Sequence, residues 1–175
     1  MKPKVIAIVG GKKVGKTTTT ENLIKELTKK GYKVAAIKHV SEPDFTIDTP
    51  GKDTWRFAQK GAKTVIIISP NEIATIEKGG TETTPLQALL KKCREKDIVL
   101  IEGLKTQVAK KTSISKIAVV TSKEEAENAI TRYKPIIAFS GPFNTEAINT
   151  EIPYADAIKN PGKLANIVEN QIHKK

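Results

Sequence analysis

The sequence contains a single cysteine, Cys93, among its 175 residues. One cysteine cannot form an internal disulfide, and it cannot supply the paired thiolates of a structural zinc site. Proteins that do without disulfides are typical of reducing compartments, so we expect a cytoplasmic protein.

Long apolar runs are also missing. No stretch approaches the roughly 20 apolar residues that a membrane-spanning helix needs. The apolar run at residues 4–9 is too short for a secretory leader, and it ends in a glycine-rich loop rather than a cleavage site. We therefore expect neither a membrane segment nor a signal peptide.

Aromatic residues make up only 5% of the chain, whereas the formal net charge is +11. A strongly basic chain suits either nucleic acid or phosphorylated small molecules as ligands. The lysines are scattered rather than gathered in one stripe, and no basic–aromatic motif of an RNA- or DNA-binding module occurs. These absences favour small anionic ligands over nucleic acid.

A phosphate-binding loop follows the first apolar run. Residues 10–17 fit the Walker A pattern of a glycine, any four residues, and Gly-Lys-Thr. The glycines allow the backbone to approach an anion closely, and the loop N–H groups form a positive concavity at the start of a helix. Lys16 is expected to reach a β- or γ-phosphate, and Thr17 to offer its hydroxyl to Mg²⁺. The residues expected around the phosphates are Gly10, Gly11, Lys13, Val14, Gly15, Lys16, Thr17 and Thr18.

Apolar runs alternate with helical patterns along the whole chain. Strand patterns cover residues 4–9, 33–37, 64–69, 72–77, 97–103, 117–120 and 136–139, and helical patterns cover 17–30, 53–60, 86–94, 122–133 and 160–173. Residues 107–115 have the composition of a polar surface excursion. The first two strands are expected to form a right-handed βαβ unit. The alternation predicts one α/β domain over residues 1–175, with a three-layer, doubly wound, mainly parallel sheet of the P-loop NTPase class.

Glu102 ends a run of four apolar residues, and this pattern matches the second signature of P-loop NTPases. In that signature a carboxylate at the carboxyl end of a strand orients Mg²⁺ or its water beside the phosphate loop. Glu102 is therefore a candidate metal-binding and catalytic residue. The other interpretation is an acid whose charge is satisfied by a neighbouring lysine.

A long segment without periodicity, residues 38–52, leaves the carboxyl end of the second strand, where open parallel sheets bind ligands. Asp44 and Asp48 are candidates for acting on metal or on attacking water, and Lys52 or Arg56 for binding a second phosphate group. Each of them alone also fits a solvated charge. His39 directly follows the strand, where either an acid–base role or a simple hydrogen bond fits.

The identity of the base is poorly encoded. The Asn-Lys-x-Asp motif with which Ras-like GTPases read guanine does not occur. The loop at 139–144 follows the last strand, and Asn144 there suits a purine contact or an ordinary turn equally well. Pattern alone leaves ATP and GTP open.

Several blocks of the sequence occur in the same order as in one known family. They are residues 6–18, 37–39, 44–48, 50–56, 61–62 and 100–105. Over about residues 4–105 the chain resembles the family of molybdopterin-guanine dinucleotide biosynthesis protein B, MobB. The Pro-Gly-Lys-Asp-Thr block together with Glu-Gly-Leu-Lys is far more specific than a phosphate loop by itself.

The resemblance implies a homodimeric GTP-binding protein with weak GTPase activity. It implies a partner, a molybdenum cofactor guanylyltransferase that joins GMP to molybdopterin to give molybdopterin guanine dinucleotide. It places GTP and Mg²⁺ at the phosphate loop, with Thr17 and Glu102 at the metal. It also places residues 38–53 in a mobile loop near the γ-phosphate or the pterin, where the candidates are His39, Asp48, Lys52 and Asp53.

Two departures from related patterns accompany the resemblance. The family usually carries further histidine after Lys-His, whereas residues 40–43 are Val-Ser-Glu-Pro, so only His39 is a candidate here. Gly11 occupies the place of the signature lysine of dimer-sandwich ATPases. The alternatives from other classes are a small-molecule kinase or other metabolic NTPase, which would seat an acceptor in the long loop, and a basic nucleic-acid-binding NTPase.

Overall fold

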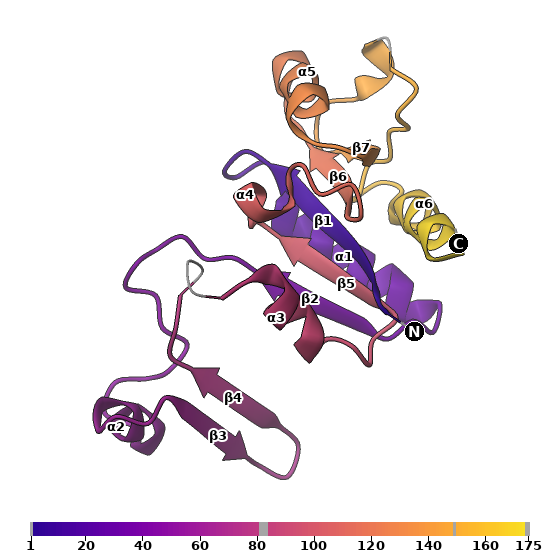
Figure 1. Ribbon diagram of the computed structural model, residues 1–175. Coiled ribbons are helices and arrows are strands. Elements are labelled where there is room, and N and C mark those ends of the chain that lie inside the picture. Colours follow the sequence, from indigo (N-terminus) through magenta and orange to yellow (C-terminus); the bar gives the residue numbers. More distant parts are fainter. Residues whose placement is uncertain (1, 81–83, 149, 174–175) are drawn as a thin grey trace. The chain divides into compact units, whose positions relative to one another are not determined.

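The computed structural model describes residues 2–80, 84–148 and 150–173 (Figure 1). The chain forms two compact units. One consists of Met1–His39 and Leu89–Lys175, and the other of Val40–Ala88. No helix among the described residues is both long and apolar enough to cross a membrane.

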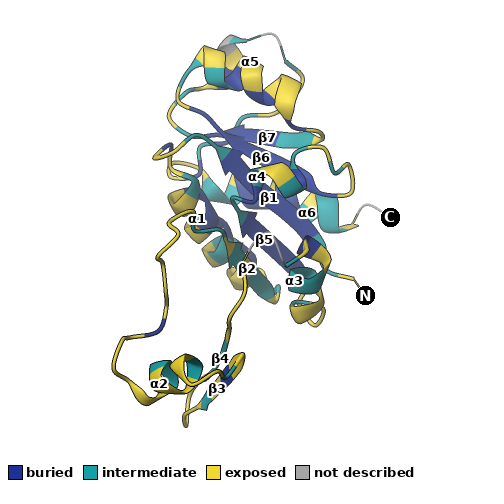
Figure 2. Ribbon diagram, turned by 60° about the vertical axis from the view of Figure 1, so that its left-hand side comes forward, coloured by how far each residue is buried: buried dark blue, intermediate teal, exposed yellow. Residues whose placement is uncertain are grey.

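A five-stranded parallel sheet forms the centre of the first unit. In spatial order its strands are β2 (Val34–Lys38), β5 (Ile98–Glu102), β1 (Lys4–Gly10), β6 (Ser115–Val119) and β7 (Ile136–Ser140). The three central strands are almost wholly buried (Figure 2), as expected of parallel strands that are covered on both faces. The predicted mainly parallel α/β fold is confirmed.

Helices lie on both faces of this sheet. α1 (Lys16–Lys29) and α6 (Pro161–His173) contact each other and pack on β1. α4 (Lys105–Val108) and α5 (Lys123–Arg132) lie on the opposite face (Figure 1). The core between α1, α6 and the sheet contains Leu23, Leu27, Leu164 and Val168. α3 (Leu86–Lys92) precedes β5 in the chain.

Two helix starts form as their capping residues predict. The Ser122 hydroxyl accepts a hydrogen bond from the Glu125 N–H at 3.2 Å, and the Asn160 side chain accepts one from the Lys163 N–H at 3.2 Å. Both oxygens satisfy N–H groups that a helix leaves without internal partners.

β1 and β2 are parallel strands of one sheet joined through α1, as the predicted βαβ unit requires, and β5 lies between them. One expectation about the first unit needs correction. Residues 107–115 are not merely a polar excursion, since Val108 and Ile114 are buried and α4 begins at Lys105. Two lysines and three hydroxyl residues give this segment a polar composition, which obscured its two apolar residues.

The second unit contains a hairpin and a short helix. β3 (Thr64–Ile68) and β4 (Ile73–Glu77) pair antiparallel in a sheet of their own, and α2 (Asp53–Gln59) packs on β3. Residues 64–69 and 72–77 were predicted to be strands of the doubly wound sheet, and they do form strands, but in a separate sheet. Val65 is buried, whereas Ile66 and Ile68 on the alternate face are 61% and 76% exposed. A two-stranded sheet with a helix on one side leaves its other face uncovered.

Lys116 is a buried lysine in the middle of the sheet. Its side chain has no exposed surface, and its ammonium donates to the carbonyl oxygens of Lys111 at 2.6 Å and Lys134 at 2.5 Å. Burial lowers the pKa of the Lys116 ammonium. These two hydrogen bonds tie the segment before β6 to the segment before β7.

Replacing Lys116 with methionine is expected to destabilise the fold by about 1–3 kcal/mol, because two backbone carbonyls lose a charged donor while most of the side-chain volume remains. Urea denaturation measures the change, and Lys163→Met at an exposed position of α6 is the control. A variant as stable as the parent would mean that burying the ammonium costs as much as its hydrogen bonds contribute.

Candidate functional site

The loop between β1 and α1 has the backbone shape that an anion site requires. Gly15 caps α1 with φ of 98°, and Gly10 has φ of 153°. A Cβ atom added to Gly10 would lie 2.4 Å from the carbonyl oxygen of Val119, so no side chain fits there. Val14 is buried and anchors the loop to the core. The loop is thus held against β6 with its N–H groups ahead of a helix N-terminus, where anions bind.

Lys16 folds back across this loop. Its ammonium donates a hydrogen bond to the carbonyl oxygen of Gly11. Burial lowers the pKa of Lys16, and the nearby Glu102 carboxylate acts in the opposite direction. A phosphate is a stronger partner for an ammonium than a neutral carbonyl, since charge-assisted hydrogen bonds are about twice as strong. Lys16 is therefore placed to exchange Gly11 for an anion in the loop.

Thr17, Lys38 and Glu102 converge beside the loop. The Thr17 hydroxyl donates to Oε1 of Glu102 at 2.9 Å. The Lys38 ammonium lies 3.0 Å from the same Oε1 and 3.2 Å from the Thr17 hydroxyl oxygen. Lys38 and Glu102 are paired residues of neighbouring strands, which brings them together at the carboxyl edge of the sheet. Glu102 therefore has the lysine partner of the second interpretation and also contacts the phosphate-loop threonine, while its role at a metal stays a prediction.

This arrangement tests whether the chain suits Mg²⁺. A hydroxyl oxygen and a carboxylate oxygen meet around one cation, the Lys38 ammonium, and hard oxygen ligands of this kind are the ones Mg²⁺ prefers. Within the described part of the chain, no group of three or more His, Cys, Asp or Glu side chains could hold a metal. The residues therefore fit a Mg²⁺ ion that takes its remaining ligands from nucleotide phosphates and water, and not a metal held by protein alone.

The backbone of His39 is hydrogen-bonded to the end of β5. The backbone N–H of His39 donates to the carbonyl oxygen of Glu102 at 2.9 Å. Gly103 has φ of 96°, and a Cβ atom there would lie 2.8 Å from Cβ of His39. The glycine of the Glu-Gly-Leu-Lys block is therefore required both by its backbone angle and by the close approach of His39.

The remaining candidates belong to the second unit. Asp48 is 9% exposed, and its Oδ1 accepts from the Thr49 N–H at 2.9 Å and from the Thr54 hydroxyl at 2.8 Å. Within the described residues, its other carboxylate oxygen is buried without a hydrogen-bond partner. Lys52 and Asp53 begin α2. The contacts of Asp48 organise the turn before α2, and a role for these three residues at the nucleotide stays a prediction.

Sequence reasoning missed Lys38 as part of the site. Lys38 ends an apolar strand, but only the pairing of β2 with β5 puts it opposite Glu102. The available signal was that two parallel strands both end in a charged residue, one basic and one acidic.

Comparisons with known proteins show what the chain is similar to. Residues 5–140 match the family model described as MobB, Molybdopterin guanine dinucleotide synthesis protein B. A putative molybdopterin-guanine dinucleotide biosynthesis adapter protein of Methanocaldococcus jannaschii is 32% identical over 126 residues, which is 71% of this chain but half of that relative. The adapter protein of Haemophilus influenzae is 26% identical over 97% of this chain and 89% of its own length.

A solved structure shares the fold. The crystal structure of a molybdopterin-guanine biosynthesis protein B superposes with a TM-score of 0.74 at 23% identity, covering 97% of this chain and 99% of the other. The arrangement of strands and helices is therefore one that has been observed experimentally in a related protein.

Proposed function

This chain belongs to the MobB family, and we propose that it is a GTP-binding adapter in the biosynthesis of molybdopterin guanine dinucleotide. The observation that carries the proposal is that the Thr17 hydroxyl and the Glu102 carboxylate both contact one cation, the Lys38 ammonium, beside a Walker A loop. The partner would be a molybdenum cofactor guanylyltransferase, acting on molybdopterin in the cytoplasm.

The roles of the loop residues follow from their contacts. The N–H groups at the start of α1 receive the phosphates, and Lys16 leaves the Gly11 carbonyl for a β- or γ-phosphate oxygen. Thr17 and Glu102 would hold Mg²⁺ in the place of the Lys38 ammonium. When bound, Mg²⁺ would neutralise part of the negative charge of the phosphates.

Slow hydrolysis fits this arrangement better than rapid phosphoryl transfer. Glu102 accepts from Thr17 and pairs with Lys38, and it is one of the two residues that would hold Mg²⁺, so it is not a free catalytic base. We retain residues 38–53 as a segment that contributes to the γ-phosphate or pterin through His39, Asp48, Lys52 and Asp53. This segment departs from the first unit after β2, so we treat the chain as one nucleotide-binding domain with an insertion.

Affinity for GTP and ATP in the presence of Mg²⁺ tests the nucleotide, and GTP is expected to bind more tightly. Formation of molybdopterin guanine dinucleotide is then measured with a guanylyltransferase and molybdopterin, with and without this protein. Equal or tighter binding of ATP, together with no effect on the transferase, would contradict the proposal. Rapid transfer of phosphate to an added metabolite would favour a kinase instead.

We propose that the chain forms a homodimer through the outer face of the β3–β4 hairpin. Ile66, Ile68 and Ile73 lie on this face and are 61%, 76% and 71% exposed. An isolated two-stranded sheet is only marginally stable in water, and each strand of such a sheet is an edge strand that further pairing can extend. A second copy of the hairpin supplies an identical apolar face and a matching edge, which suits a symmetric interface.

Replacing Ile68 with lysine is expected to weaken the dimer by roughly 30-fold or more, because it places a charge in the centre of an apolar contact. Sedimentation velocity at several protein concentrations measures the effect. Ile158→Lys is the matched control, since Ile158 is 72% exposed and belongs to the first unit. A dimer that survives Ile68→Lys but dissociates with Ile158→Lys would place the interface elsewhere.

A further inference from the structure

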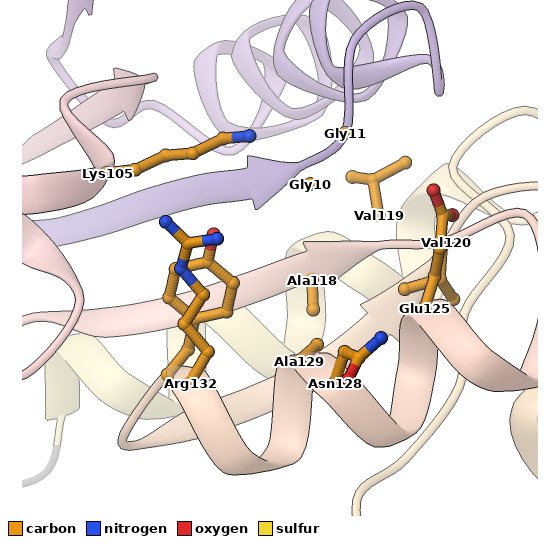
Figure 3. Close-up of a pocket in the computed structure, with 11 residues that line it drawn as sticks. Gly10, Gly11, Lys105, Ala118, Val119, Val120, Glu125, Asn128, Ala129 and Arg132 are labelled. Atoms are coloured by element: carbon orange, nitrogen blue, oxygen red, sulfur yellow. The ribbon is translucent and has the colours of Figure 1, made fainter.

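A pocket of about 170 Å³ opens beside the first two glycines of the phosphate loop (Figure 3). Its walls come from the end of β1, the end of β6, α4 and α5, all within the first unit. The residues that matter for its chemistry are Lys105, Ala118, Glu125, Ala129, Arg132 and Tyr133. The pocket lies on the α5 face of the sheet, whereas α1 rises on the other face.

Two cations extend into this pocket from opposite sides. Lys105 comes from α4 and Arg132 from the last turn of α5, and Figure 3 shows Lys105 extending toward Gly11 and Arg132 directed from α5 toward β1. Among the described residues, Lys105 forms no ion pair or side-chain hydrogen bond. The guanidinium carbon of Arg132 lies 5.6 Å from the centre of the Tyr133 ring. Both charges are therefore available to a ligand.

The surrounding charges strengthen the preference for an anion. Burial lowers the pKa of Lys105, and the positive charges of Lys16 and Arg132 lower it further. Glu125 is the one acidic residue of the pocket lining. Its Oε2 already accepts from the N–H and the hydroxyl of Thr121 at 2.7 and 2.9 Å. The Glu125 carboxylate is thus hydrogen-bonded at the start of α5, and it does not neutralise both cations.

The uncharged part of the pocket is small and apolar. Ala118 and Ala129 are buried, and the buried ring of Tyr133 lies beneath the Arg132 guanidinium. The short side chains of these two alanines leave space between two strands and a helix. The apolar walls of that space suit a flat group. The chemistry that suits the whole pocket is a planar molecule with a doubly charged phosphate, because arginine forms paired hydrogen bonds with phosphate oxygens and lysine adds a point charge.

We propose that this pocket binds the phosphomonoester group of a second ligand, with Lys105 and Arg132 as its anion contacts, next to the nucleotide and separate from it. In the proposed function, on which this choice of ligand rests, the second ligand is the phosphate-bearing pterin. Gly10 and Gly11 line both the loop and the pocket, so the pterin phosphate and the nucleotide would share one wall of backbone.

Titration calorimetry with a pterin that carries a side-chain phosphomonoester tests the proposal, with the same pterin as the free alcohol for comparison. The full chain is used, saturated with GDP and Mg²⁺. The phosphorylated pterin is expected to bind at least about tenfold more tightly than the alcohol, as charge-assisted contacts require. Lys105→Gln and Arg132→Gln are each expected to weaken its binding about tenfold. Lys123→Gln, which removes a charge from an exposed position of α5, is expected to leave it within about twofold.

Other outcomes separate this inference from the proposed function. Variants that bind the phosphorylated pterin as tightly as the parent would overturn the pocket assignment. So would variants that lose affinity for GTP but not for GDP, because the two cations would then serve the γ-phosphate. If the parent protein binds the phosphorylated pterin through these residues but does not bind GTP, the pocket assignment holds and the proposed function fails.

Discussion

Replacing Lys16 with alanine is expected to weaken the binding of GTP and Mg²⁺ by roughly 2 kcal/mol or more, about 30-fold in affinity. The ammonium of Lys16 is held within the loop by the Gly11 carbonyl, close enough to exchange that partner for a phosphate. Its partial burial makes a charge-assisted contact stronger than one at the open surface. Fluorescence titration with a labelled GTP analogue measures the loss.

The matched control for Lys16→Ala is Lys25→Ala, which removes the same charge from an exposed position of α1. It is expected to change the affinity by less than about twofold, since exposed charges at this distance are screened by salt. Unchanged affinity in Lys16→Ala would remove Lys16 from the site, while equal losses in both variants would indicate a general effect of net charge.

Removing the Lys38 ammonium is expected to strengthen Mg²⁺ binding in the GTP complex by roughly tenfold, and neutralising Glu102 is expected to weaken it by at least as much. Lys38 occupies the position between the Thr17 hydroxyl and the Glu102 carboxylate, so it competes with the metal for the same oxygens. The Lys38→Met variant keeps an unbranched side chain of similar length without the charge. Glu102→Gln keeps the shape and removes the charge that both cations need.

Magnesium titrations of the nucleotide complex measure both changes, and Lys33→Met is the control because Lys33 is exposed and precedes the opposite end of β2. If Lys38→Met weakens Mg²⁺ binding, then Lys38 supports the metal site by holding Glu102 in place. That result would contradict competition between the ammonium and the metal, and it would leave the assignment of Glu102 intact.

The fold was largely predictable because parallel strands buried on both faces produce continuous apolar runs. β1 and β5 carry such runs, and a glycine-rich turn follows each of them. Continuous runs carry no information about what covers the strand, however. The apolar run at residues 64–68 is the same whether one face of the strand or both are covered, so the sequence did not reveal that β3 pairs with β4 in a separate sheet.

The candidate site was predictable in so far as it is local in the sequence. Lys16 and Thr17 belong to one short motif, and Glu102 to another. The contribution of Lys38 depends on strand pairing across 64 residues, which no local pattern records. Lys105 and Arg132 lie on helices of ordinary composition, and only the closing of α4 and α5 around the end of β1 brings them to one pocket.

Because β5 lies between β1 and β2, the register of the strands decides which charged side chains lie beside the phosphate loop. Glu102 is aligned with Ile8 on one side and with Lys38 on the other. A slip of one residue between β2 and β5 would turn Lys38 toward the opposite face and bring Ile37 or His39 into line with the carboxylate. Substitutions deep in the core that loosen this alignment would therefore alter ion preference at the rim without touching any residue there.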